Sequence, residues 1–119
     1  MLLLMMLLTT ASAWANDAVT YIDMNGKTQT VTEYTEVTSD MTADGNGYIY
    51  WDSGTYVVKS DVTLNGCIRF NSDVVDLIVC DGAMLTVNGN NNRGAFNGYT
   101  LNIYAQSTGT GMGAVNVKK

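Results

Sequence analysis

Residues 62–66 read VTLNG, and residues 85–89 read LTVNG. Each phrase alternates apolar and polar side chains and then ends in Asn-Gly. Such alternation is typical of a strand with one buried face, and Asn and Gly tolerate the positive φ values of tight corners. The two phrases lie 23 positions apart. This repeat of strand and corner together is the feature that decides the fold.

A second pair of segments repeats at nearly the same interval. Residues 77–79 (LIV) correspond to residues 101–103 (LNI), 24 positions further on. Repeats of this length, made of short strands and Gly/Asn corners, are typical of solenoids, where each unit buries its apolar face against its neighbour. The sequence therefore predicts an all-β fold, a parallel β-helix (solenoid) of two to three coils. The expected stacked pairs are Val62 with Leu85, Leu64 with Val87, Leu77 with Leu101, and Val79 with Ile103.

The last interval is longer than the others. Residues 114–117 (AVNV) match residues 84–87 (MLTV) at a distance of 30 positions, so residues 106–113 should bulge outward. About two and a half coils are present, whereas such stacks usually need at least about three. We therefore expect further β-helix coils, with this chain as the N-terminal part of a longer protein. The alternative fold is a sandwich of antiparallel hairpins, because turn signals every 8–12 residues suit it as well.

The first half of the chain has a different pattern. Residues 18–38 alternate on both sides of Asn25-Gly26, which is the strongest short signal for a β-hairpin. Residues 48–51 (YIYW) and 55–58 (TYVV) are further strands around a turn at 52–54. We expect residues 16–60 to form an N-terminal hairpin cap with capping strands, and residues 61–119 to form the coils.

Residues 1–15 (MLLLMMLLTTASAWA) differ from everything that follows. An apolar run leads to Ala13-Trp14-Ala15, and an A-x-A pattern of this kind marks a signal-peptide cleavage site, here before Asn16. The run is shorter than the ~20 residues of a membrane-spanning helix. The alternative is a buried N-terminal helix. The sequence favours a signal peptide and an exported protein, which is secreted or on the cell surface and meets the membrane only through that peptide.

The composition excludes several classes of function. The net charge is −5, and the six basic residues are scattered except at the C-terminus, so we expect no nucleic-acid partner. The absence of His removes Ser-His-Asp and Cys-His catalytic arrangements and His-containing metal sites. Two Cys do not suffice for zinc. We therefore expect no catalytic residues, no metal and no cofactor.

Four aspartates are the remaining candidates for acid–base or Ca²⁺ chemistry. The candidates are Asp61, Asp73, Asp76 and Asp81. Asp61, Asp73 and Asp81 border strand ends, where Asp commonly forms corners. Calcium sites need several converging carboxylates, so we interpret these residues as structural. Arg69 and Arg93 lie roughly one coil apart, where a substrate-binding role is the less favoured hypothesis.

Cys67 and Cys80 are the two cysteines of the chain. Export would permit a disulfide. Their separation of 13 residues is about half a coil, which places them on different sides of the winding, and a bridge needs Cα atoms within about 7 Å. Two small packed residues are the favoured interpretation, and a disulfide is the alternative.

The densest aromatic cluster contains Tyr48, Tyr50, Trp51 and Tyr56. Flat aromatic rings can stack on sugar faces, so these four residues are the best candidates for contact with a glycan. The alternative role is to cover the open end of the first coil, because a solenoid end needs cover and aromatic side chains bury the largest area. The sequence favours this capping role.

Several longer motifs resemble those of the repetitive, adhesin-like surface proteins secreted by gut-type anaerobic bacteria. Examples are YVV and then TLNIYAQS, and the preceding Tyr21-Ile22-Asp23 is similar as well. The matching stretches are Gly54–Ser60, Asp61–Thr63, Asp73–Val74, Leu77–Gly82, Leu85–Val87 and Leu101–Ser107. The resemblance implies a right-handed parallel β-helix, export, and a surface or adhesin-like role as one module of a larger chain. It implies no catalytic residues.

Together these observations predict a binding or structural module of the bacterial surface that contacts glycans or host surface proteins. A second hypothesis is an N-terminal fragment of a polysaccharide lyase or hydrolase whose active site lies in further coils. A third, less favoured, is a truncated reading frame without a function of its own.

Overall fold

The computed structural model describes residues 16–71, 74–90 and 92–118. Within these ranges the protein is all-β, and no helix is long and apolar enough to cross a membrane. The strands are β1 (Val19–Ile22), β2 (Thr28–Val31), β3 (Thr35–Glu36), β4 (Tyr48–Trp51), β5 (Gly54–Val58), β6 (Val62–Asn65), β7 (Cys67–Phe70), β8 (Val74–Val79), β9 (Met84–Asn88), β10 (Phe96–Asn97), β11 (Thr100–Ala105) and β12 (Ala114–Lys118).

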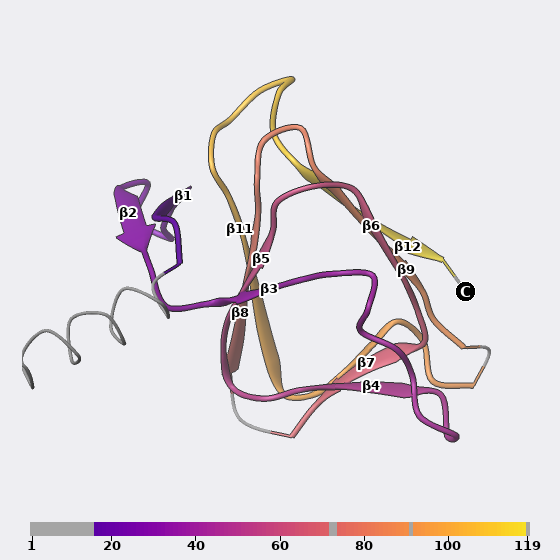
Figure 1. The fold of residues 1–119 in the computed structure, drawn as a ribbon. Helices are drawn as coiled ribbons and strands as arrows, with labels where there is room; N and C mark the ends of the chain where they lie inside the picture. Colours follow the sequence, from indigo (N-terminus) through magenta and orange to yellow (C-terminus); the bar gives the residue numbers. More distant parts are fainter. Residues whose placement is uncertain (1–15, 72–73, 91, 119) are drawn as a thin grey trace, which may run out of the picture.

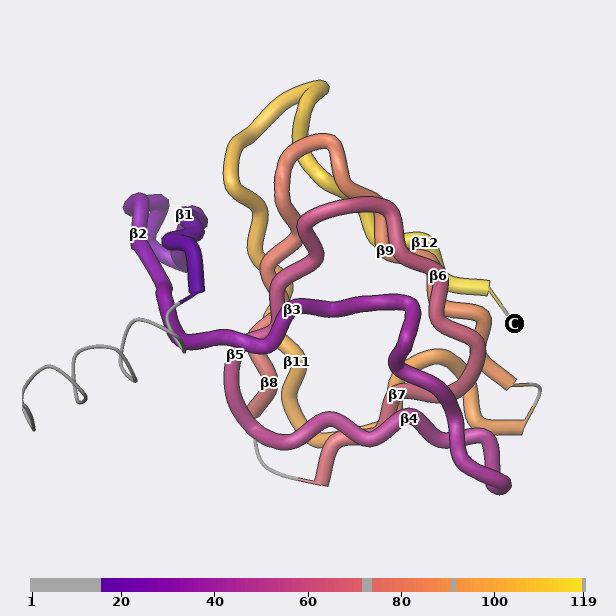
Figure 2. The backbone as a smooth tube through the Cα atoms, in the orientation of Figure 1, coloured from indigo at the N-terminus to yellow at the C-terminus, as the bar shows by residue number. Residues whose placement is uncertain are grey.

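Three parallel sheets make up most of the protein. Their strand orders are β10-β7-β4, β11-β8-β5-β3 and β12-β9-β6. From β4 onward, consecutive strands therefore enter different sheets (Figures 1 and 2). Three successive strands, one in each sheet, make up one pass of the chain, and each strand pairs with its counterpart in the next pass. The alternative fold, a sandwich of antiparallel hairpins, is excluded for the described residues, because β1 and β2 form their only antiparallel ladder.

The inward faces of the three sheets share one hydrophobic core. Along β6 and β9, alternate side chains are buried, and Val62 pairs with Leu85 and Leu64 with Val87, as predicted. The match of Ala114–Val117 to Met84–Val87 is confirmed too. The core consists of Val37, Ile49, Trp51, Tyr56, Val58, Val62, Leu64, Ile68, Phe70, Val75, Leu77, Val79, Ala83, Leu85, Val87 and Ala95.

One predicted register is wrong by two residues. Leu101 pairs with Val75 and not with Leu77, and Ile103 pairs with Leu77 and not with Val79. The interval between β8 and β11 is therefore 26 residues, because the connection through residues 89–99 carries a small local turn, bridged between Asn90 and Gly94. A shift of two residues leaves each side chain on the same face of the strand. The assignment of inward-facing residues therefore survives the error.

The repeated Asn-Gly corners have a direct structural role. The side-chain amide of Asn88 donates a hydrogen bond of 2.8 Å to the side-chain oxygen of Asn65, one pass away. Gly66 has φ +146°, and a Cβ there would lie 2.9 Å from the Cβ of Ala43. A Cβ on Gly89 would lie 2.2 Å from the carbonyl oxygen of Gly94. The corners thus need Asn for the bond between passes and Gly for the close approach of other chain segments.

The predicted hairpin is confirmed, but it is shorter than expected. β1 and β2 pair antiparallel with Ile22 opposite Thr28, around the turn at Asn25-Gly26. The second strand ends at Val31, and Thr35–Glu36 pairs parallel with β5 instead. The loop between β11 and β12 extends beyond the corresponding loops of earlier passes, as predicted (Figure 2).

The hairpin covers a side of the protein and not the end of the core. Val57 and Ile78 point away from the main core and pack with Val19 of β1, with Tyr21 and Tyr104 beside them. This second cluster lies on the outer face of β11-β8-β5-β3. The hairpin cap is therefore corrected to a lateral cover, because this sheet is apolar on both faces and needs burial on both.

The residues after the hairpin cover the first end of the core. The segment from Thr35 to Gly47 crosses in front of the winding chain (Figure 2), and its Val37, Met41 and Ala43 pack on the core. Behind them, the rings of Trp51 and Tyr56 stack at 4.2 Å with an interplanar angle of 9°.

Candidate functional site

The outer face of sheet β10-β7-β4 carries the most varied surface chemistry among the described residues. Ile49, Trp51, Ile68 and Phe70 point into the core, so the alternate residues of β4 and β7 point outward. One outward row crosses the three strands, because Tyr50 pairs with Arg69 and Arg69 pairs with Asn97. The backbones that carry this tyrosine, arginine and asparagine are about 4.8 Å apart from one strand to the next.

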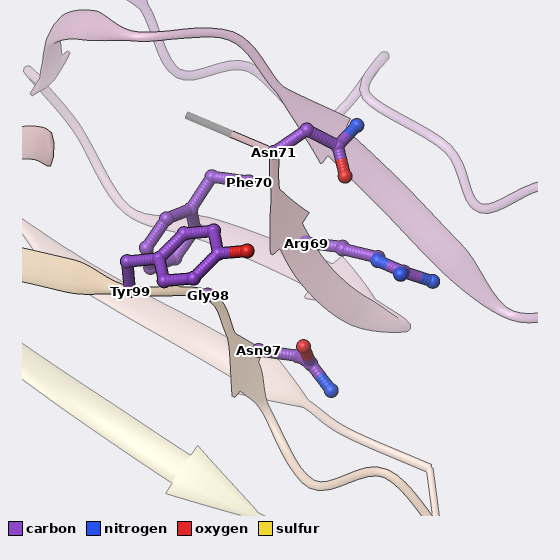
Figure 3. A pocket seen from close by; sticks show the side chains of 6 residues that line it. All are labelled: Arg69, Phe70, Asn71, Asn97, Gly98 and Tyr99. Atoms are coloured by element: carbon purple, nitrogen blue, oxygen red, sulfur yellow. The ribbon is translucent and has the colours of Figure 1, made fainter. Parts of the chain in front are cut away.

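A hollow of about 260 Å³ lies beside this row. Arg69, Phe70, Asn71, Asn97, Gly98 and Tyr99 line it (Figure 3). The polar ends of Arg69, Asn71 and Asn97 extend toward the same side, and the Tyr99 hydroxyl points toward them. The ring of Tyr99 is 78% exposed. The hollow thus combines hydrogen-bond donors and acceptors with one accessible aromatic face.

Gly98 sets the depth of this hollow. A Cβ at Gly98 would lie 2.2 Å from the ring of Phe70, so the backbone of Gly98 can pass the ring only without a side chain. Phe70 is buried and belongs to the core. The floor of the hollow is therefore formed against a residue of the hydrophobic core.

Two arginines converge on one tyrosine at the edge of the row. The guanidinium carbons of Arg69 and Arg93 lie 4.9 Å and 4.8 Å from the centre of the Tyr48 ring. Arg93 also donates from Nη1 to the carbonyl oxygen of Asn46 at 3.2 Å. Cation–π contacts of this kind hold a guanidinium in place. Tyr48 therefore orients both cations on the outer face.

Asp44 and Tyr50 form the acidic edge of the same surface. Hydrogen bonds from the backbone amides of Tyr48 and Asn46, at 3.1 Å and 2.9 Å, lower the pKa of Asp44, and the nearby Arg93 lowers it further. Desolvation, followed by the charge of Asp44, raises the pKa of Tyr50. Asp44 therefore stays ionised and Tyr50 stays protonated at neutral pH.

The four aromatic residues predicted from the sequence separate into two pairs. Trp51 and Tyr56 are 2% and 7% exposed, so their rings are out of reach of a ligand, and they stack in the core near its first end. Tyr48 and Tyr50 lie on the outer face, with ring centres 5.9 Å apart. The alternation of residues along a strand could have separated Trp51 from Tyr48 and Tyr50 in the sequence YIYW.

Sequence reasoning missed Asn71, Asn97 and Tyr99. Asn97 and Tyr99 join the site only through the pairing of β7 with β10, whereas Asn71 directly follows β7. The sequence makes a ligand role for Arg69 the less favoured hypothesis, whereas in the structure this residue lines the hollow. Knowledge of which strands pair was the missing signal, since Tyr50 and Asn97 are 47 positions apart.

The aspartates considered for catalysis bond to their own protein. Asp61 accepts from the Met84 amide at 2.9 Å, Asp76 from the Asn102 side chain at 2.9 Å, and Asp81 from the Ser107 hydroxyl at 2.7 Å. Asp73 lies outside the described residues. Within residues 16–71, 74–90 and 92–118, no three acidic or Cys residues converge as metal ligands.

Both cysteines are free thiols, so the predicted alternative of a disulfide between them is wrong. Cys67 is buried on the outer side of β7, beneath the carbonyl oxygen of Arg93 at 3.6 Å. Desolvation raises the pKa of Cys67 and of Cys80. Both thiols are thus protonated at neutral pH and poorly nucleophilic.

Comparison with known proteins adds no assignment to this geometry: no protein-family model, curated protein or solved structure matches the chain.

Proposed function

We propose that the chain is an exported, right-handed parallel β-helix module that binds carbohydrate through the outer face of β10-β7-β4. Its localisation is secreted or cell-surface, as in the adhesin-like proteins of gut-type anaerobic bacteria that it resembles. The parallel registers of all three sheets and the order in which the chain enters them support the β-helix.

The single observation that carries the binding function is the exposed aromatic and polar hollow. Tyr50 is 50% exposed and Tyr99 is 78% exposed, although large aromatic side chains usually bury most of their area. Ring faces next to amide and guanidinium groups suit a sugar, which has an apolar face and a rim of hydroxyl groups. Pockets with a few convergent polar groups are the usual binding sites of small ligands.

Direct binding measurements test this function. The purified protein is applied to a glycan array, and its ligands are measured by isothermal titration calorimetry. We expect Tyr99→Ala and Tyr50→Ala each to weaken binding about fivefold, which corresponds to roughly 1 kcal/mol of lost ring contact. The control is Met24→Ala, which removes a 74% exposed side chain from the hairpin and should change nothing. Failure to bind any glycan would reject the proposal.

The proposed export has its own test. N-terminal sequencing of the protein recovered from a culture medium should begin at Asn16, after the Ala13-Trp14-Ala15 pattern. Replacement of Ala15 by a large residue should leave the leader attached, because the cleavage site requires small residues. Recovery of the protein only inside the cell, with Met1 retained, would contradict export.

A further inference from the structure

The arginines of the outer face indicate which class of glycan this site would take. The protein has a net charge of −5, with six basic residues in the whole chain. Two of those six converge on the Tyr48 ring, each within 5 Å of its centre. Their guanidinium carbons are therefore less than about 10 Å apart, which is comparable with the Debye length of roughly 8 Å at physiological salt. The two cations repel each other across one small surface.

The nearby acidic group offsets this repulsion only for one of them. Asp44 lies close enough to Arg93 for the arginine to lower the pKa of its carboxyl, and Arg93 also bonds to Asn46. The ion pair found among the described residues joins Lys59 to Glu36, on another sheet. Within that same part of the chain, no carboxylate is in salt-bridge distance of Arg69. Arg69 lines the hollow together with Asn71 and Asn97, and its guanidinium lies over the Tyr48 ring.

We propose that the site selects acidic glycans, and that Arg69 contacts an anionic oxygen group on the sugar; this inference rests on the proposed carbohydrate binding. A planar guanidinium presents two parallel N–H donors to a carboxylate. The amides of Asn71 and Asn97 can bond to the flanking hydroxyl groups, and Tyr99 offers its ring to the apolar face of the sugar. Arg93 adds a second positive charge at the edge of the site and attracts the ligand without entering the hollow.

Carboxylate and sulfate are the two sources of such a group on natural glycans, and suitable probes separate them. The probes are an oligogalacturonate, its fully methyl-esterified form, a sulfated galactan oligosaccharide and a neutral galactan oligosaccharide. We expect the oligogalacturonate to bind at least tenfold more tightly than its methyl ester, and its affinity to fall as salt is raised. Tighter binding of the sulfated galactan would still support the selection of acidic glycans and would identify the anionic group as sulfate.

Variants that remove one positive charge inside or outside the site test whether Arg69 is responsible for the preference for acidic glycans. Arg69→Gln should lower the affinity for the acidic probe at least tenfold. Its affinity for the methyl ester should stay within twofold of that of the unmodified protein. Arg69→Lys should recover part of the loss, because it restores the charge but not the two parallel donors. Lys59→Gln is the matched control, since it makes the same change of net charge outside the site and should have almost no effect.

The possible failures are distinguishable. If neutral and acidic probes bind equally, or if Arg69→Gln has the same effect as Lys59→Gln, the selection of acidic glycans is wrong and carbohydrate binding stands. If none of the probes and no array glycan binds, both proposals fail. Thermal unfolding of each variant checks that a loss of binding does not come from a loss of fold.

Discussion

The two ends of the hydrophobic core differ in how they are covered. At the first end, Val37 is 1% exposed, and the stacked rings of Trp51 and Tyr56 lie behind it. At the last end, Ile103 and Val117 are 52% and 55% exposed, although their register partners Leu77 and Val87 are fully buried. Residues at equivalent positions in one row therefore contribute unequally to stability. The contribution of each residue depends on how far its strand lies from the exposed end of the core.

The largest effect should come from one row tested at two places. Leu77→Ala should lower the free energy of unfolding by about 3–4 kcal/mol, because it removes a buried side chain and leaves a cavity. Ile103→Ala, in the same row, should cost less than about 1 kcal/mol, since half of that side chain is already in water. Urea unfolding followed by circular dichroism measures both values. Equal losses would contradict the difference between the ends.

The corner glycines at the covered end should come next. Gly66→Ala should cost about 2 kcal/mol, because alanine is strained at φ +146° and its Cβ would meet Ala43 of the covering segment. Gly45→Ala is the matched control, since its φ is not positive and nothing lies within 4 Å of its Cβ. Chemical denaturation of the two variants should separate them clearly. If Gly66→Ala left the free energy of unfolding unchanged, the close contact of this corner with the covering segment at Ala43 would be contradicted.

The tryptophan at the covered end should be less critical than its burial indicates. The indole N–H of Trp51 is buried and has no hydrogen-bond partner among the described residues. Trp51→Phe loses ring area but also removes a polar group that is costly to bury without a partner. We expect a loss of less than about 1.5 kcal/mol in the free energy of unfolding.

The smallest effect should be an acid sensitivity of the loop at the covered end. The pKa of Asp44 is lowered in the folded protein, chiefly by the Tyr48 amide. Its contribution to stability is therefore present above the ordinary Asp value near 3.8 and is lost as the pH falls through the lower folded value. The hydrogen-exchange protection factors of the Tyr48 and Asn46 amides, which correct for the intrinsic pH dependence of exchange, should fall as the pH drops through the folded pKa of Asp44. Asp44→Asn should remove that pH dependence.

The repeated corner phrase was sufficient to predict the parallel pairing of β6 with β9, because strand and corner repeat together at a fixed interval. The same reasoning failed by two residues between β8 and β11, where the local turn at Asn90–Gly94 lengthened one pass. A single sequence does not show how many residues a loop absorbs. Side-chain alternation constrains only which face a residue takes, and those assignments held.

The candidate site was predictable only in part. Tyr48 and Tyr50 stood out by local aromatic density, but Trp51 and Tyr56 share that density and lie in the core. Asn97 and Tyr99 carry no local signal at all. Their place in the site follows from the pairing of β10 with β7, a contact between residues far apart in the sequence.

The outward row of Tyr50, Arg69 and Asn97 takes one residue from each of three strands. No two of these residues are neighbours in the sequence, and none of the three belongs to the core. Substitutions can therefore change the chemistry of this outer face one group at a time without altering the interior. Duplication of the segment that supplies one strand to each sheet would lengthen the same outer face by one more residue, so its chemistry can be extended without a new fold.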